Sequence, residues 1–466
     1  MSKKLLWSIY SLFLVAGIAQ AAIVPLLPRL SSQYGLSPSE TGLLLALPGL
    51  ATLAVSVPAG VAADRLGARR CTVLAGAVLC VSCVAEAAPS LALLLVGRAL
   101  FGVAYGVVWT TGVAWLAELD TAERAAAERD TAERAARERD TAERDPAERG
   151  IRSGGSRIGP SVTCASVGMM LGPAVGGFLA GAGATGLPFL LIAIVAAIVM
   201  VPLTIGGARA ATTTVGRWPG DRAGAAADEA AELARAVGYS ETAELAASVG
   251  YGDPVPCGGG RARALRSAVR RPGVVAAIGA LVVSGAVSSV SQLLISGGLH
   301  HDGLSTGRIG LAFSAAAISY IAVSIAVVRL GVRVHTLRFN AMATAAMAVV
   351  LVPGLVSGSA SVLIVTLMVA SMPRAAVSTI SYSLASAGSG PNGGVRDSAA
   401  DGSVFGVING AWAGSMVLAP LLAGMLEQHG GARVGFLAVI VPALLIAIGL
   451  LMRSRHPAVA AHAAVT

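Results

Sequence analysis

Apolar residues are gathered into long runs along the chain, separated by shorter polar segments. Each run covers roughly 20 residues without a charge at its centre, the length that a helix needs to cross about 30 Å of hydrocarbon. Helices are required there because lipid offers the backbone no hydrogen-bond partner. The pattern therefore predicts an all-α integral membrane protein with about twelve transmembrane helices. The expected spans lie at 5–27, 41–62, 72–90, 91–116, 159–180, 186–206, 273–296, 309–328, 339–357, 360–385, 403–426 and 434–452.

Composition and charge support this interpretation. The 466 residues are 55% hydrophobic and only 13% charged, whereas soluble domains are about 25% charged. With both termini in the cytoplasm, almost all lysines and arginines fall in cytoplasmic segments, and only Arg29, Arg308 and Arg433 fall in outer loops. The net charge of +9 then follows from the positive-inside rule. It predicts a multi-pass protein of the cell (plasma or inner) membrane and no nucleic-acid partner.

The spans divide into two halves. We expect six-helix bundles at 1–206 and 272–456, a cytoplasmic linker at 207–271 and a cytoplasmic tail at 457–466. A repeat supports this division, since YGLSPSETGLL (34–44) and HDGLSTGRIGLAF (301–313) precede the second and eighth spans. Each reads as a Gly-Leu-Ser turn, a helix N-cap and a glycine on the incoming helix. Pseudo-symmetric halves around a central path are a common transporter design.

A charged cytoplasmic insert at 120–149 interrupts the first half. It repeats DTAER with period ten at 120–144, which places each aspartate four residues before an arginine. Such pairs favour a helix, and the absence of an apolar stripe indicates a solvated or disordered segment, with docking of a partner as the alternative.

The loop between the second and third spans reads GVAADRLGARR at 60–70. It resembles the signature of the major facilitator superfamily, although Ala62 and Ala68 depart from it. The resemblance implies the major facilitator fold, with two pseudo-symmetric six-helix bundles, and a gate in which Asp64 meets the N-terminal end of the eleventh span. The residues that fall on the signature are Gly60, Asp64, Arg65, Gly67 and Arg69.

Two charged residues are candidates for ion coupling. Arg98 lies inside the fourth span, where a charge is costly and marks a functional site. With Gly102 four residues later, it resembles the intramembrane arginine motif that the family uses in proton coupling. Glu86 lies near the outer end of the third span, and no other acid lies closer to the centre of a span.

The fifth span carries VGMMLGPAVGGFLAG at 167–181. Glycines four residues apart favour close helix packing, and proline bends a helix. The pattern resembles the motif of the drug:proton antiporter group, a 12-helix branch of the family, and this resemblance implies an exporter. Its residues are Gly168, Gly172, Pro173, Gly176 and Gly177.

The resemblance to the family also implies that the first, fourth, seventh and tenth helices line a central cavity. Polar or aromatic residues lie on one face of each of these spans, although lone serines often bond to their own helix. The lining candidates are Gln20, Tyr105, Trp109, Ser284, Ser288, Gln292, Arg374, Ser378 and Tyr382.

These features predict a monomeric secondary transporter that exports small hydrophobic or amphiphilic compounds, most simply in exchange for protons. A facilitator or importer of a small metabolite is the first alternative, because no acid lies centrally in a span. A membrane sensor or scaffold acting through the charged insert is the second. We expect no enzyme activity and no cofactor. We also expect no metal site, since adjacent side chains such as those of His300, His301 and Asp302 rarely converge on one ion.

Overall fold

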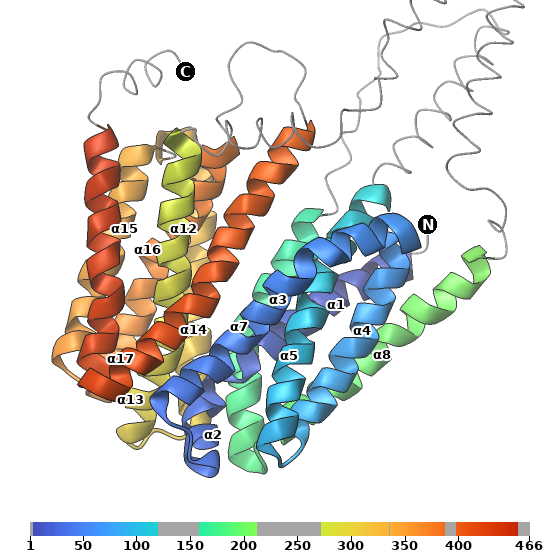
Figure 1. Ribbon diagram of the computed structural model, residues 1–466, viewed down its shortest axis with the longest axis horizontal. Helices are drawn as coiled ribbons and strands as arrows, with labels where there is room; N and C mark the ends of the chain where they lie inside the picture. The colour runs from blue at the N-terminus through green and yellow to red at the C-terminus, as the bar shows by residue number, and fades with distance from the viewer. Residues whose placement is uncertain (1–2, 120–157, 212–271, 335, 387–397, 455–466) are drawn as a thin grey trace, which may run out of the picture.

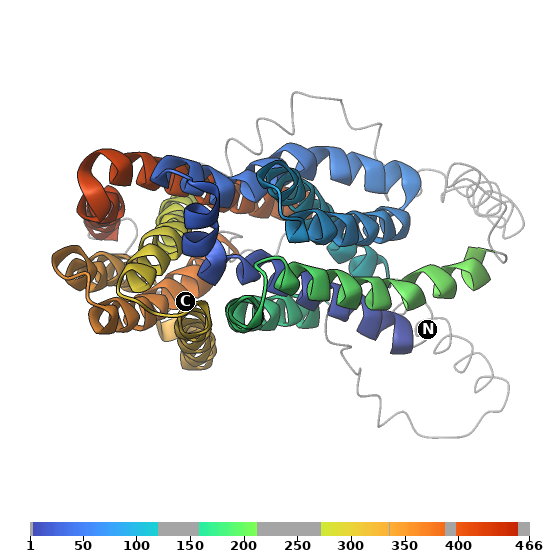
Figure 2. The ribbon, with the colours of Figure 1, turned by 90° about the horizontal axis from the view of Figure 1, so that it is seen from below.

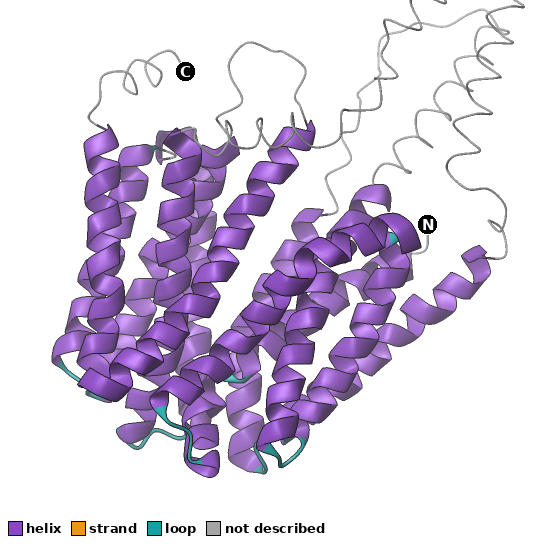
Figure 3. Cartoon of the chain, viewed as in Figure 1, coloured by secondary structure: helices purple, strands orange, loops and turns teal. Residues whose placement is uncertain are grey.

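The computed structural model describes residues 3–119, 158–211, 272–334, 336–386 and 398–454, and these residues form helices joined by short turns, with no strand among them (Figure 3). The predicted insert at 120–149 and almost all of the predicted linker at 207–271 lie outside them. The helices of the first half are α1 (Lys3–Ala22), α2 (Leu27–Tyr34), α3 (Pro38–Leu66), α4 (Ala68–Ala87), α5 (Leu91–Val107), α7 (Ile158–Ala182) and α8 (Leu187–Ala211), with a 3-10 turn η1 (Val24–Leu26) and a π-turn η2 (Val108–Gly112).

The second half repeats this plan. Its helices are α12 (Pro272–Val290), α13 (Ser296–His301), α14 (Thr306–Leu330), α15 (Leu337–Val356), α16 (Ala360–Ser386) and α17 (Ser398–Ser454), with a π-turn η3 (Ser291–Ile295) and a 3-10 turn η4 (Gly331–Val334). The two halves form separate bundles that lie side by side (Figures 1 and 2).

Eleven helical segments in the described residues are long and apolar enough to cross a membrane. The last of them, Gly410–Ser454, has 45 residues and contains Gly431 at φ 74°, where two helices join. A positive φ breaks the helical path, and glycine adopts it without a steric penalty. The eleventh and twelfth predicted spans are therefore both contained in α17. The prediction of an all-helical membrane protein with the major facilitator architecture is confirmed.

Large apolar side chains are exposed in stripes along the outside of the bundles. On α16 they are Val365, Val369 and Met372, which recur at helical spacing. Stripes of this kind on helix after helix are the surface expected of a protein whose solvent is lipid.

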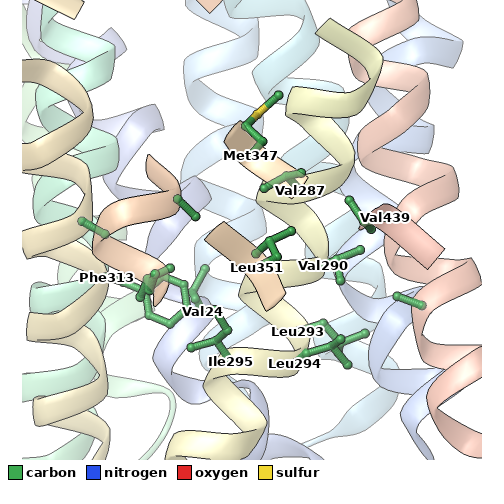
Figure 4. Packing of buried hydrophobic residues seen from close by; sticks show 14 of the residues in the cluster. Val24, Val287, Val290, Leu293, Leu294, Ile295, Phe313, Met347, Leu351 and Val439 are labelled. Carbon is green, nitrogen blue, oxygen red and sulfur yellow. The ribbon is translucent and has the colours of Figure 1, made fainter. Parts of the chain in front are cut away.

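The two bundles touch at one end of the molecule. We call it the loop end, because it carries α2 and α13, and we call the opposite end, where α1 begins and α17 ends, the terminal end (Figure 1). A buried apolar cluster crosses between the bundles at the loop end. Val24 of the first half lies close to Ile295 and Phe313 of the second (Figure 4).

The repeat recognised in the sequence builds this contact. Ser37 and Ser305 occupy the N-cap positions of α3 and α14, and each follows a glycine with positive φ two residues earlier. Ser37 accepts a hydrogen bond from the Glu40 amide in a capping box, which satisfies amides that the helix leaves free. No such side-chain bond forms at Ser305. The repeat therefore starts both helices at equivalent positions.

Five residues after each cap, a glycine meets the opposite bundle. A Cβ at Gly42 would collide with the carbonyl oxygen of Pro420, and one at Gly310 with that of Pro173. Four residues after each of these prolines, the same helix carries a glycine that contacts the backbone of the opposite bundle. Gly424 meets the carbonyl of Pro38, and Gly177 meets that of Thr306. The α3–α17 and α7–α14 contacts are thus two copies of one arrangement.

The bundles part toward the terminal end. Gly42 and Gly60 lie on the same face of α3, because 18 residues make about five turns. A Cβ at Gly60 would meet no atom within 4 Å, and neither would one at Gly410 or Gly414 of α17. Backbone contact therefore holds at the loop end and is lost toward the terminal end, where the ribbons diverge (Figure 1).

Replacement of Gly177 by valine should open the loop end. The new side chain has no room against the Thr306 carbonyl, and overpacking of this kind costs about 1–3 kcal/mol. Double electron–electron resonance between labels at the exposed positions Ala184 and His301 should report longer distances than in the parent. Gly449→Val, on a lipid-facing site with open space, is the control. Unchanged distances in Gly177→Val would contradict this packing.

Candidate functional site

The predicted gate loop lies where α3 ends and α4 begins, at the terminal end. Gly67 has φ 88° and joins the two helices. Arg69 lies 5.8 Å from the ring of Trp115 and donates a hydrogen bond of 3.5 Å to the carbonyl of Leu203. Arg65 is exposed. The side chain of Asp64 and those of the first turns of α17 lie outside the described set, so their contact stays a prediction.

Arg98 and Glu86 form an ion pair inside the first bundle. The Nη1 atom of Arg98 lies 3.6 Å from Oε1 of Glu86, and the two side chains are 0% and 1% exposed. Arg98 therefore does not reach water at the membrane surface. A charge buried in a bilayer is tolerated where it meets an opposite charge. The contact between these two candidates was not predicted from the sequence.

The surroundings of the pair are close and largely apolar. Gly97 allows the contact, because a Cβ there would lie 2.7 Å from Cγ of Glu86. The guanidinium carbon of Arg98 lies 5.1 Å from the centre of the Phe101 ring, a cation–π distance. The pair distance exceeds that of a good hydrogen bond, and the nitrogens of Arg98 have no hydrogen-bond acceptor within the described residues. Loss of either charge would leave the other poorly compensated.

Aromatic side chains continue along the same helix. The ring of Tyr105 lies 5.6 Å from Phe101 and 6.1 Å from Trp109, and Trp109 lies 5.3 Å from Phe13 of α1. The indole nitrogen of Trp109 and the amide oxygen of Gln20 are buried without a hydrogen-bond partner in the described part of the chain. The predicted lining residues Tyr105 and Trp109 thus belong to one row of aromatic rings that packs against α1.

Arg374 is the centre of a polar cluster in the second bundle. It donates a hydrogen bond of 2.5 Å to the hydroxyl of Ser288 on α12, and its guanidinium carbon lies 4.8 Å from the ring of Tyr320 on α14. Next to it, the hydroxyls of Ser284 and Ser378 lie 3.3 Å apart. The structure thus brings together four predicted lining residues. Tyr320 was not among them, because the eighth span was not expected to line the cavity.

The remaining lining candidates of the second bundle are Gln292 and Tyr382. Gln292 is half-buried in the π-turn η3, and the side chain of Tyr382 lies outside the described set. Its neighbour Ser381 accepts a hydrogen bond of 3.2 Å from Asn340 of α15. Ser381 therefore belongs to the bundle interior.

The fifth-span motif serves two contacts. A Cβ at Gly168, Gly172 or Gly176 would collide with the backbone of α1, within the first bundle. Pro173 and Gly177 face α14 of the second bundle. The motif is therefore a backbone-packing element that reaches both bundles.

The His300, His301 and Asp302 run lies exposed at the loop end. Asp302 accepts a hydrogen bond from the Ala360 amide and so caps α16. Within the described residues, no group of three histidine, cysteine, aspartate or glutamate side chains could hold a metal ion.

The Glu86–Arg98 pair should show strong energetic coupling. Removing one partner of a buried pair costs about 3–5 kcal/mol, whereas removing both costs much less. We expect Glu86→Gln and Arg98→Gln each to lower the melting temperature in detergent. The double variant should show less than half of the decrease obtained by adding the two single decreases. Arg329→Gln, at an exposed site, is the control. Additive losses in the double variant would show that the two charges do not interact.

Comparisons with known proteins agree with this architecture. The family model described as Major Facilitator Superfamily matches residues 9–127. An uncharacterized MFS-type transporter of Schizosaccharomyces pombe is 35% identical over 108 residues, which are 22% of this chain and 24% of that protein. One of Yersinia pestis is 33% identical over 99 residues, or 21% and 25%. The chain thus matches about a quarter of the length of each relative.

Solved structures share the fold over nearly the whole chain. A bacterial homologue of the human lysosomal transporter Spinster, in an inward-facing and unoccupied conformation, has a TM-score of 0.66 at 14% identity and covers 98% of both chains. A POT family transporter in complex with 5-aminolevulinic acid scores 0.63 at 13%, covering 97% of this chain and 95% of that one. The nucleoside transporter NupG scores 0.62 at 10%, covering 97% and 99%. The chain is therefore similar to the major facilitator superfamily over residues 9–127, and its described residues have the major facilitator fold.

Proposed function

We propose that this protein is a secondary active transporter that exports small hydrophobic or amphiphilic compounds in exchange for protons by alternating access. The observation that carries the proposal is the one-sided contact of the two bundles. Glycine-mediated backbone contacts join them at the loop end, while Gly60 and Gly410 face open space toward the terminal end. Rocking of two bundles about a central site is how such folds move a substrate.

We further propose that the terminal end lies on the cytoplasmic side of the cell membrane. Basic residues gather there, as the positive-inside rule requires, and the arrangement then corresponds to an inward-open state. The described basic residues at this end include Lys3, Lys4, Arg65, Arg69, Arg70, Arg329 and Arg453.

Proton coupling is assigned to the Glu86–Arg98 pair. A carboxylate that alternates between a buried arginine and a proton can load and release that proton as its surroundings change. The fold does not select this coupling, because structural neighbours include Spinster, POT and nucleoside transporters. A facilitator or importer of a small metabolite is the second candidate. It is favoured because the Glu86–Arg98 pair lies close to the loop end and not at the centre of a span.

Transport in inside-out vesicles tests the proposal. A panel of one lipophilic cation, one neutral dye and one amphiphilic anion should include a compound that accumulates when the vesicle interior is acidic. Asp64→Asn should reduce this accumulation at least about tenfold, which corresponds to about 1.4 kcal/mol. Arg453→Gln, at an exposed position of the terminal end but outside this loop, is the matched control.

Glu86→Gln separates coupling from transport. It should remove the dependence on the pH gradient while leaving exchange of labelled for unlabelled compound. Gradient-driven accumulation that survives in Glu86→Gln would rule out this carboxylate as the coupling site. If no compound moves in the parent protein, the transport proposal fails.

A further inference from the structure

We propose that Arg374 binds the anionic group of the transported compound, so that the substrates are small amphiphilic organic anions such as aryl carboxylates or sulfonates. This inference rests on the proposed transport function and names the substrate class. The charge of Arg374 is not neutralised by any acidic side chain in the described residues.

Arg374 has no acidic partner in the described part of the chain, where the ion pair of Arg98 with Glu86 is the only one. The sequence of its neighbourhood explains this, since α12, α14, α15 and α16 contain no aspartate or glutamate. The two intramembrane arginines therefore differ. Arg98 is fully buried and paired, whereas Arg374 is half-buried and meets a hydroxyl and an aromatic ring.

The position of Arg374 fits a substrate site. It lies 14 residues after Ala360 and 12 before Ser386, so it is about 21 Å and 18 Å along the helix from the two ends of α16. It also lies half a turn away from the lipid-facing stripe of Val365, since nine residues make about two and a half turns. An intramembrane charge near mid-depth and turned away from lipid is a candidate for a transport pathway.

The neighbours of Arg374 hold it in place without neutralising it. The ring of Tyr320 and the hydroxyl of Ser288 each contact the guanidinium, yet neither carries a negative charge. A guanidinium has five N–H donors in a fork that matches a carboxylate or a sulfonate, and the single bond to Ser288 leaves donors for an anion. The half-buried aromatic side chains of Tyr105 and Trp109 in the first bundle suit an apolar body on the same compound.

Equilibrium dialysis of the full chain in phosphatidylcholine nanodiscs tests this assignment, with empty discs subtracted. The probes are 1-naphthoate, the uncharged 1-naphthamide and the cation 1-naphthylmethylammonium, which share one ring system. We expect naphthoate to bind at least about tenfold more tightly than either of the others, because a hydrogen-bonded ion pair is available to it alone. Equal binding of the three probes would overturn the inference, and this arm needs no variant.

Substitutions then locate the site. Arg374→Gln should abolish the preference for naphthoate, and Arg374→Lys should retain part of it, because lysine keeps the charge without the fork. Arg329→Gln, which removes an arginine from an exposed helix end, should have no effect. A preference that survives in Arg374→Gln would place the anion elsewhere.

Two further arms of the experiment distinguish a small-molecule ligand from a lipid headgroup, and this inference from the proposed function. In discs that contain phosphatidylglycerol, unchanged binding supports a small-molecule site, whereas loss in proportion to that lipid would assign Arg374 to a lipid headgroup. Equilibrium dialysis measures binding alone and requires neither a pH gradient nor transport of the compound. Arg374-dependent binding without vesicle transport would defeat the proposed function alone, while transport of the cation with no naphthoate preference would defeat this inference alone.

Discussion

Backbone contact between the two bundles, possible only where glycine stands opposite a carbonyl group, is the constraint on which the rest of the structure depends. Gly42 with Pro420 and Gly310 with Pro173 are its two copies. Without a hydrophobic driving force between helices in lipid, such contacts supply close van der Waals packing. The bond from the Ala174 amide to the Ser314 hydroxyl joins α7 to α14 beside one of these contacts.

The sequence predicted where two helices of this contact begin, but not the contact itself. The repeated Gly-Leu-Ser turn correctly placed the starts of α3 and α14, because cap and turn chemistry is local. It could not reveal that Gly424 of α17 is the counterpart of Gly177 of α7, since a glycine pattern does not name the helix against which it packs. The fifth-span motif was recognised for its spacing, whereas its division between α1 and α14 depends on tertiary packing.

The candidate site shows the same division. Composition and span position identified Arg98, Glu86 and Arg374, because any charge inside an apolar run is conspicuous. Pairing could not be deduced, since Glu86 and Arg98 lie on different helices and meet only because Gly97 has no side chain. Tyr320 carried no signal at all, as a lone aromatic residue in a membrane span is ordinary. Its importance comes from the approach of α14 to α16.

The Glu86–Arg98 pair and Arg374 lie at different distances from the contact between the two bundles. Arg98 lies on α5, which packs against α3 through Gly102 and the bond from the Thr52 hydroxyl to the Gly102 carbonyl. Because α3 carries Gly42, only one helix separates the buried pair from the contact between the bundles. Arg374 lies instead about midway along α16, at the depth where transporters of this design hold their substrate. Under the proposed function, a change of charge on Glu86 would therefore act on the contact between the bundles at the loop end, whereas an anion bound to Arg374 would lie at the central site.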